Sequence, residues 1–122
     1  MDAGLLIALL ACHFAADFTH MSRPFMLKAK ATGLPVLPIL AHGAVHGILI
    51  GSVCWLLIGP IAGAFAFAVQ LVFHTAIDVL KGRVNVWLPM VKDPTKYPHW
   101  ILFGADQFAH QVVIILTILF AP

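Results

Sequence analysis

Four long apolar stretches of the chain each contain one pair of His or Asp residues that lie four positions apart. The pairs are His13/Asp17, His42/His46, His74/Asp78 and Asp106/His110. Because residues i and i+4 lie on the same face of an α-helix, each pair presents two polar groups in one direction. Burial of such groups is costly unless they are paired or bind a metal. Any fold of this chain must therefore give the four pairs polar partners.

The apolar stretches are long enough to cross a lipid bilayer. They cover about residues 3–20, 36–58, 61–80 and 100–120, and helices of roughly 18–23 residues extend roughly 27–35 Å. The chain is 61% hydrophobic and 10% charged, whereas soluble domains contain about 25% charged residues. The sequence therefore predicts an all-α, integral membrane four-helix bundle, in which residues 1–122 form a single four-span transmembrane domain.

The Lys and Arg residues are confined to two of the three segments that connect the stretches. All seven lie between residues 20 and 36 or between residues 80 and 100. The positive-inside rule places these segments in the cytoplasm and both termini outside it. In this orientation each pair lies in the cytoplasmic half of its span, so the four pairs are predicted to converge at one site. The net charge of +2 is too small to indicate nucleic-acid binding.

The eight paired residues are candidate ligands of a divalent metal ion. Imidazole and carboxylate groups bind zinc, iron and manganese, and zinc is the first choice here. Two divalent ions, the three paired Asp carboxylates and one hydroxide would carry no net charge, as a low-dielectric interior favours. Gln70 and His20 lie on these helix faces and Gln107 follows Asp106, so all three are candidates for orienting the ligands by hydrogen bonds. The alternative is a set of hydrogen bonds between helices, without a metal.

The motifs around the pairs resemble those of a known family. They are His13-Phe14-Ala15-Ala16-Asp17-Phe18, His42-x-x-x-His46-Gly47, His74-x-x-Ile77-Asp78-x-x-Lys81 and Asp106-Gln107-x-x-His110. In this order they resemble the signatures of the small bacterial membrane proteins grouped as domain of unknown function family 3307. The resemblance covers nearly the whole chain and implies a four-span protein of the bacterial inner membrane, with no activity attached. The segment Thr19–Arg23 departs from the Gln-containing stretch expected there, so the resemblance assigns no role to His20.

The leading functional hypothesis is a divalent-metal-dependent hydrolase that acts on lipid-like substrates at the inner leaflet. A metal ion lowers the pKa of bound water to about 7 and polarises a carbonyl or phosphoryl oxygen. Asp78 or Asp106, where it is not a ligand, would act as general base. Lys81 and Arg83 follow Asp78 by about one turn and are candidates for binding a lipid phosphate, although both also suit ordinary cytoplasmic anchors.

Other functions are also consistent with the pattern. A metal-ion transporter or binding protein would use a similar tetrahedral site, but transport by so short a chain would require a homo-oligomer to supply alternating access. A di-iron oxidase is consistent with the number of ligands. Their type fits less well, because di-iron bundles use Glu and this chain has none. A haem held by His46 and His110 would leave six paired residues unexplained. The last alternative is a non-catalytic membrane partner subunit whose polar core only specifies helix packing.

Overall fold

The protein is described here by a computed structural model that covers residues 2–122. Over this range all regular structure is helical, and helices hold 83% of the residues. The elements in chain order are α1 (Ala3–Phe18), α2 (Pro24–Lys30), α3 (Val36–Leu57), α4 (Pro60–Val69), the π-helix η1 (Gln70–His74), α5 (Thr75–Trp87), the 3-10 helix η2 (Pro89–Lys92) and α6 (Tyr97–Phe120). The prediction of an all-α fold is confirmed.

Three helices are long and apolar enough to cross a membrane. They are α3, the continuous helix Pro60–Trp87 formed by α4, η1 and α5, and α6. The helix α1 is also apolar, but its 16 residues extend about 24 Å, which is shorter than a hydrocarbon core of about 30 Å. It ends at Phe18, before the predicted residue 20, because Thr19 is extended and its hydroxyl donates to the Ala15 carbonyl.

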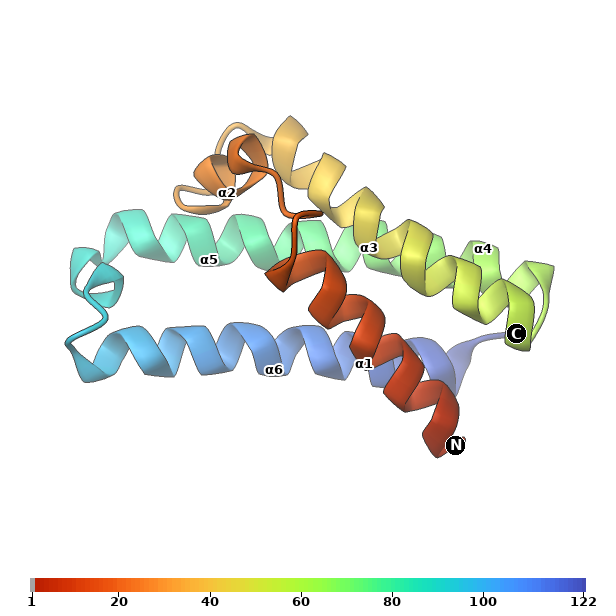
Figure 1. Cartoon of the computed structure of the whole chain (residues 1–122). Coiled ribbons are helices and arrows are strands. Elements are labelled where there is room, and N and C mark those ends of the chain that lie inside the picture. The colour runs from red at the N-terminus through yellow and green to blue at the C-terminus, as the bar shows by residue number, and fades with distance from the viewer. Residues whose placement is uncertain (1) are drawn as a thin grey trace.

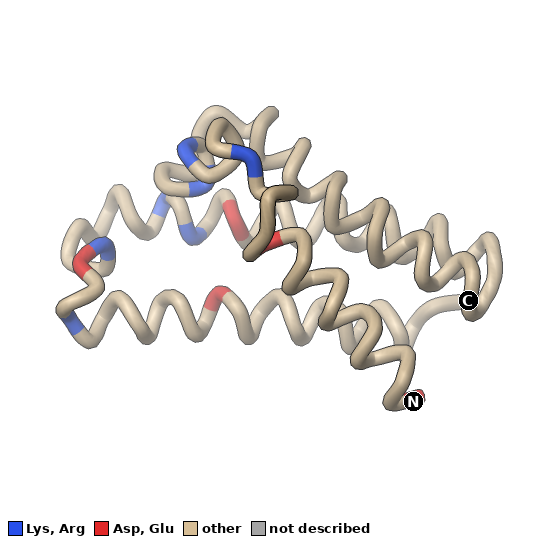
Figure 2. The backbone as a smooth tube through the Cα atoms, viewed as in Figure 1, with Lys and Arg blue, Asp and Glu red and all other residues tan. Residues whose placement is uncertain are grey.

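The long helices pack side by side (Figure 1). The helix α3 contacts α1, α4, η1 and α5, and α6 contacts the same four elements. Both termini and the turn between α3 and α4 lie at one end of the molecule, which we call the terminal end. The helix α2 and the connection between α5 and α6 lie at the opposite end. Figure 2 shows that the Lys and Arg residues gather there, and we call it the basic end.

An apolar core fills the half of the molecule nearer the terminal end. Its buried side chains come from α1, α3, α4 and α6, and they are Leu9, Ile50, Cys54, Ala66 and Ile114. On each helix these residues lie between the His/Asp pair and the terminal end. The polar pairs are therefore packed against apolar side chains on one side, while the basic end lies on the other.

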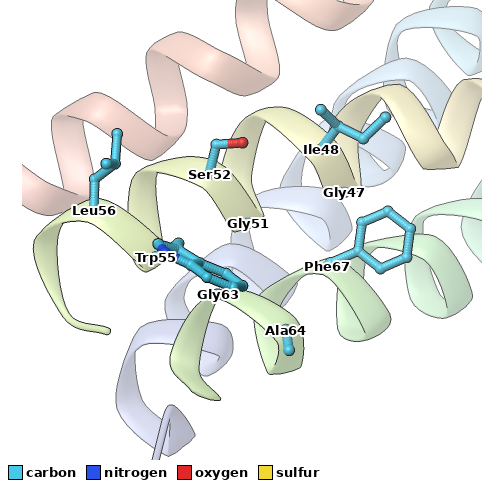
Figure 3. A pocket seen from close by; sticks show the side chains of 9 residues that line it. All are labelled: Gly47, Ile48, Gly51, Ser52, Trp55, Leu56, Gly63, Ala64 and Phe67. Atoms are coloured by element: carbon cyan, nitrogen blue, oxygen red, sulfur yellow. The ribbon is translucent and has the colours of Figure 1, made fainter. Parts of the chain in front are cut away.

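Glycines allow α3 to lie directly against α4 (Figure 3). A Cβ atom at Gly47 would lie 2.9 Å from the Phe67 ring, and one at Gly63 would lie 2.6 Å from the Cβ atom of Trp55. Gly47 and Gly63 also line a mostly apolar surface groove of about 520 Å³ between the two helices. This close approach continues along η1 and brings His42 and His46 of α3 next to His74.

The helix that begins at Pro60 is longer than the sequence predicts. The apolar pattern ends near residue 80, but the helix continues through Lys81 and Gly82 to Trp87. A glycine inside a helix normally costs about 1 kcal/mol relative to alanine. Here the missing side chain has a packing function, because Gly82 is buried against the segment that follows α2.

The segment between the first two long helices contains the short helix α2, where the sequence analysis expects only a connection. Pro24 occupies its first turn, where a missing N–H is harmless. Gly33 follows its end with φ 77°, a conformation that favours glycine. The helix buries Met26 and Ala29 and lies against α3 and α5.

The contact between Gly33 and Gly82 determines how closely α2 approaches α5. A Cβ atom at Gly82 would overlap the backbone nitrogen of Gly33 and would lie 2.6 Å from the Lys30 carbonyl oxygen. Because both partners are backbone atoms, neither can yield by a change of rotamer. A side chain at position 82 would therefore push the end of α2 outward.

Replacing Gly82 with Ala is expected to destabilise the protein even though alanine favours a helix. Propensity alone stabilises the variant by about 1 kcal/mol, whereas overpacking costs about 1–3 kcal/mol. Thermal unfolding in detergent should therefore show a lower midpoint for Gly82→Ala. Gly104→Ala is the matched control, because Gly104 lies inside α6 and nothing lies within 4 Å of its Cβ position. If the two variants have equal midpoints, the packing role of Gly82 is wrong.

Candidate metal centre

The structure brings the eight paired side chains together in one cluster. The convergence predicted from the order of the pairs is therefore present. Seven of these residues are buried, and the Asp17 side chain is 5% exposed. The His/Asp cluster consists of His13 and Asp17 from α1, His42 and His46 from α3, His74 from η1, Asp78 from α5, and Asp106 and His110 from α6.

The π-turn decides which residues of the third stretch face the cluster. His74 ends η1 and Asp78 lies in the first turn of α5. A π-turn bonds residue i to i+5 and is common at functional sites. Gln70, on the far side of this turn, does not contact the cluster; its Nε2 donates to Thr117 Oγ1 at 3.3 Å. Gln70 therefore makes no hydrogen bond to the candidate ligands in this structure, in which the α-helical spacing is interrupted before His74.

Asp17 and Asp78 each have three imidazole contacts, and Asp17 has the shorter ones. Its Oδ1 lies 2.8 Å from His42 Nε2 and 3.3 Å from His46 Nε2. Its Oδ2 lies 3.5 Å from His13 Nε2 on the same helix. One carboxylate thus joins imidazoles of α1 and α3.

Asp78 and Asp106 form the other side of the cluster. His74 Nε2 lies 3.4 Å from Asp78 Oδ2, and His110 Nε2 lies 3.6 Å from Asp78 Oδ1. His110 Nε2 also lies 3.5 Å from Asp106 Oδ1. Each of the five clustered imidazoles therefore has its Nε2 atom next to a carboxylate oxygen.

The imidazole rings also contact one another. The ring centroids of His46 and His74 lie 3.6 Å apart, and those of His74 and His110 lie 4.0 Å apart, with both pairs stacked. His42 Nε2 and His46 Nε2 lie 3.2 Å apart. Two imidazole nitrogens at this distance need either a shared proton or a common cation. The ring of His74 stacks on both His46 and His110.

Two groups within the cluster have the composition and spacing to hold a metal ion. The first is Asp17, His42, His46 and His74, and the second is His74, Asp78 and His110; within each group the ligand atoms lie within 4.8 Å of one another. Three imidazoles and one carboxylate form a donor set that suits zinc or iron. His74 belongs to both groups.

Several buried polar atoms of the cluster have no hydrogen-bond partner among the described residues. They are His13 Nδ1, His42 Nδ1, His46 Nδ1, both ring nitrogens of His74 and His110, both oxygens of Asp78, and Asp106 Oδ1. Most buried polar atoms in proteins are paired, so each exception needs an explanation. A cation bound at Nε2 and carboxylate oxygens would provide one for those atoms, but not for the Nδ1 atoms.

Lys30 is an unexpected member of the cluster. Its Nζ lies 3.1 Å from Asp17 Oδ1, 3.2 Å from Asp78 Oδ2 and 3.0 Å from His42 Nε2. Burial disfavours the charged form, but the carboxylates of Asp78 and Asp17 outweigh this effect and raise the pKa of the Lys30 ammonium above its ordinary value. A fixed positive charge therefore lies among the candidate ligands.

The sequence contains a weak signal for this role of Lys30. Its position in a basic connecting segment predicts only a cytoplasmic anchor. However, Pro24 and Gly33 are start and stop signals for a short helix. Met26 and Lys30 then lie on one face of that helix, next to Ala29, and this is the face that the structure buries.

The other predicted site residues divide into two groups. Lys81 and Gln107 reach the cluster: Lys81 Nζ donates to Asp106 Oδ2 at 2.8 Å, and Gln107 Oε1 lies 3.4 Å from His13 Nε2. Arg83 lies with its guanidinium 5.7 Å from the centroid of the Trp87 ring and does not reach the cluster. His20 is exposed and follows the end of α1, so it does not reach it either.

A cavity of about 260 Å³ opens beside the cluster on the side of the basic end. It is lined by Asp17 and Lys30 on one side and by Lys81, Asp106 and Gln107 on another. Because these residues include two carboxylates of the cluster, the cavity connects the candidate ligands with the surface.

Fold and site together define an all-helical protein with a buried His/Asp cluster and three helices of membrane-spanning length. The family model described as "Protein of unknown function (DUF3307)" matches residues 5–121. The chain therefore belongs to this family, as the order of its four motifs suggests. No curated protein and no solved structure matches the chain.

Proposed function

We propose that this protein is a four-span protein of the bacterial inner membrane that binds a divalent metal ion in its His/Asp cluster and hydrolyses lipid-like substrates. Three membrane-length helices support the membrane location. So do large apolar side chains on the outer surface, such as Ile7, Leu56 and Phe108, which are 67%, 80% and 67% exposed. Such side chains suit contact with lipid. With the basic end in the cytoplasm, both termini lie outside it.

The observation that carries the metal proposal is the overlap of two ligand groups at His74. Their nitrogen and oxygen atoms converge from five helical elements, and the side chains are buried or, for Asp17, 5% exposed. Both Asp78 oxygens and both His74 nitrogens lack hydrogen-bond partners among the described residues, although Lys30 Nζ lies 3.2 Å from Asp78 Oδ2. A divalent ion bound at His74 Nε2 and an Asp78 oxygen would satisfy one atom of each residue.

The charges of the cluster favour one divalent ion rather than two. Two ions are balanced by three carboxylates and one hydroxide only if no ammonium group lies in the cluster. The structure adds Lys30 and Lys81, which form ion pairs with Asp17, Asp78 and Asp106. Three carboxylates, two ammonium groups, one divalent ion and one hydroxide together carry no net charge. Neutrality is what a buried polar site requires.

The cavity beside the cluster supports hydrolysis over ion transport. Asp106 belongs to neither ligand group, but it lines the cavity and lies 3.5 Å from His110. A carboxylate in this position can accept a proton from water that attacks a bound substrate. The metal would polarise the attacked carbonyl or phosphoryl group and lower the pKa of its bound water. Zinc is the first candidate, and iron and manganese are the alternatives.

A structural role without metal is the second candidate function. One protonated imidazole in place of the ion and hydroxide would also make the cluster neutral. The direct contact between His42 Nε2 and His46 Nε2, at 3.2 Å, suits such a shared proton. In that case the cluster would only specify helix packing, as in a non-catalytic partner subunit.

Metal removal distinguishes the two functions. Protein purified in detergent should contain about one divalent ion per chain by elemental analysis, and a chelator should lower its unfolding midpoint. Adding back zinc, manganese or iron should restore the midpoint, because a ligand at about 100 times its Kd stabilises the native state by about 2.7 kcal/mol. A protein whose unfolding is indifferent both to chelator and to these ions would refute the metal site and the hydrolase with it.

A further inference from the structure

A larger cavity adjoins the one beside the cluster, toward the basic end. The larger cavity measures about 440 Å³ and shares Ala31, Lys81, Asn85 and Phe103 with the smaller one. Its outer part is lined by Lys92 and His99, where η2 meets the start of α6. We call the two adjoining cavities the basic cleft. Its volume is on the scale of ligand sites, which measure roughly 300–1,000 Å³.

The basic cleft contains one positive charge that no carboxylate of residues 2–122 neutralises. Lys30 pairs with Asp17 and Asp78, and Lys81 pairs with Asp106. Lys92 lines the cleft but has no ion-pair partner among these residues. An ammonium without a partner in a cleft attracts an anion, and lysine is a common ligand of phosphate.

The position of Lys92 is fixed by a hydrogen bond between η2 and α6. His99 Nδ1 donates to the Val91 carbonyl oxygen at 2.8 Å. This bond holds the turn that carries Lys92 against the first turn of α6. Because Nδ1 makes this bond, Nε2 is the ring nitrogen left for other contacts. The outer cleft thus combines a cation with an imidazole ring.

The inner part of the cleft has apolar side chains beside its polar ones. Phe18, Leu27 and Phe103 line the smaller cavity and are 51%, 47% and 36% exposed. They lie on α1, α2 and α6, at the same cavity as Asp106 and Lys81. A ligand with an anionic group and an apolar portion would match both kinds of lining.

We propose that the basic cleft binds a phosphate ester, with its phosphate between Lys92 and Lys81, on the side of Asp106, and its apolar remainder along Phe103 and Leu27. This inference rests on the proposed function, because it names the substrate class of the hydrolase. Hydrolysis would join a water oxygen to phosphorus and break the ester P–O bond. Asp106 would accept the water proton, and the departing alkoxide would take up a proton to leave as an alcohol.

Direct binding measurements test this proposal with three probes. Detergent-solubilised protein is titrated with dihexanoyl phosphatidic acid, with inorganic phosphate and with dihexanoyl glycerol, which lacks the phosphate. Phosphatidic acid should bind and dihexanoyl glycerol should not. Binding of phosphatidic acid alone identifies a lipid headgroup as the ligand, whereas equally tight binding of inorganic phosphate identifies a soluble phosphate ester. The proposal is overturned if neither anion binds, or if dihexanoyl glycerol binds as well as phosphatidic acid.

Two matched lysine variants distinguish binding of the anionic probe in the cleft from its nonspecific attraction to the positive charges of the basic end. Lys92→Ala should weaken binding of the anionic probe about tenfold, as expected for loss of one charge-assisted contact. Lys96→Ala removes the same charge four residues away. Both lysines are exposed, but Lys96 pairs with Asp93 at 3.6 Å and does not line the cleft. It should change binding less than about twofold, and equal losses for the two variants would overturn the proposal.

Metal content measured on the same samples keeps the two proposals distinct. Lys92→Ala should retain as much metal as the wild type, because Lys92 belongs to neither ligand group. Wild-type protein that contains no metal as purified, does not respond to added zinc, manganese or iron, and still binds phosphatidic acid through Lys92 would refute the metal-dependent hydrolase and support the cleft. Metal-loaded protein with no dependence on Lys92 would refute the cleft and leave the metal site standing.

Discussion

Replacing His74 with Ala is expected to abolish metal binding and with it the stabilisation of the protein by metal. His74 is the one residue present in both candidate ligand groups, and its ring stacks on both His46 and His110. Loss of a residue that only orients a ligand already lowers metal affinity about 10–100-fold. Loss of the shared ligand itself should exceed this, and elemental analysis of the purified variant measures it directly.

The variant His74→Gln distinguishes a metal ligand from a hydrogen-bonded structural residue. Glutamine has a similar size and a polar tip, so it should largely restore the fold if the cluster is only structural. If His74 is a ligand, His74→Gln should lose metal as His74→Ala does, and its unfolding midpoint should not respond to chelator. His20→Gln is the control, since His20 is exposed and outside the cluster. Wild-type metal content in His74→Gln would contradict the assignment.

Replacing Lys30 with Met is expected to have opposite effects on the metal-free and metal-bound protein. The ammonium lies 3.1 Å from Asp17 and 3.2 Å from Asp78, so its removal leaves two buried carboxylates without their cation. Breaking a buried ion pair in this way costs about 3–5 kcal/mol. The same ammonium competes with a metal for these carboxylates, so the variant should bind metal more tightly than the wild type.

Unfolding of the Lys30→Met variant with and without metal measures both effects. With chelator its midpoint should fall well below that of the wild type, and with zinc the difference should shrink or reverse. Lys28→Met is the matched control, because Lys28 lies on the same short helix but is exposed. If the Lys30 and Lys28 variants unfold alike under both conditions, the ammonium has no role in the cluster.

The meeting of the four pairs could be predicted from the sequence, because it depends only on where each pair lies along its helix. That order is independent of exact helix ends, so errors at Phe18 or Trp87 did not affect it. The position of Gln70 could not be predicted in the same way. The π-helix between Gln70 and His74 changes which residues share a helix face, and no residue type in this segment indicates a π-helix.

The role of Lys30 could not be predicted from the sequence for a different reason. It depends on a contact between segments far apart in the chain, in which Gly82 allows the backbone at Gly33 to approach α5. A pattern of apolar residues reports which face of a helix is buried, but not what a lysine on that face meets.

The attachment of α2 has a consequence for how the charge of the cluster can change. This helix has seven residues and buries only Met26 and Ala29, so the ion pairs of Lys30 are its main attachment to the cluster. Short segments of this kind open locally at less than the global unfolding free energy. Opening of α2 would move one cation away from Asp17 and Asp78 while the helices that carry the candidate ligands stay packed. The charge of the cluster would then change by one unit without the transfer of a proton.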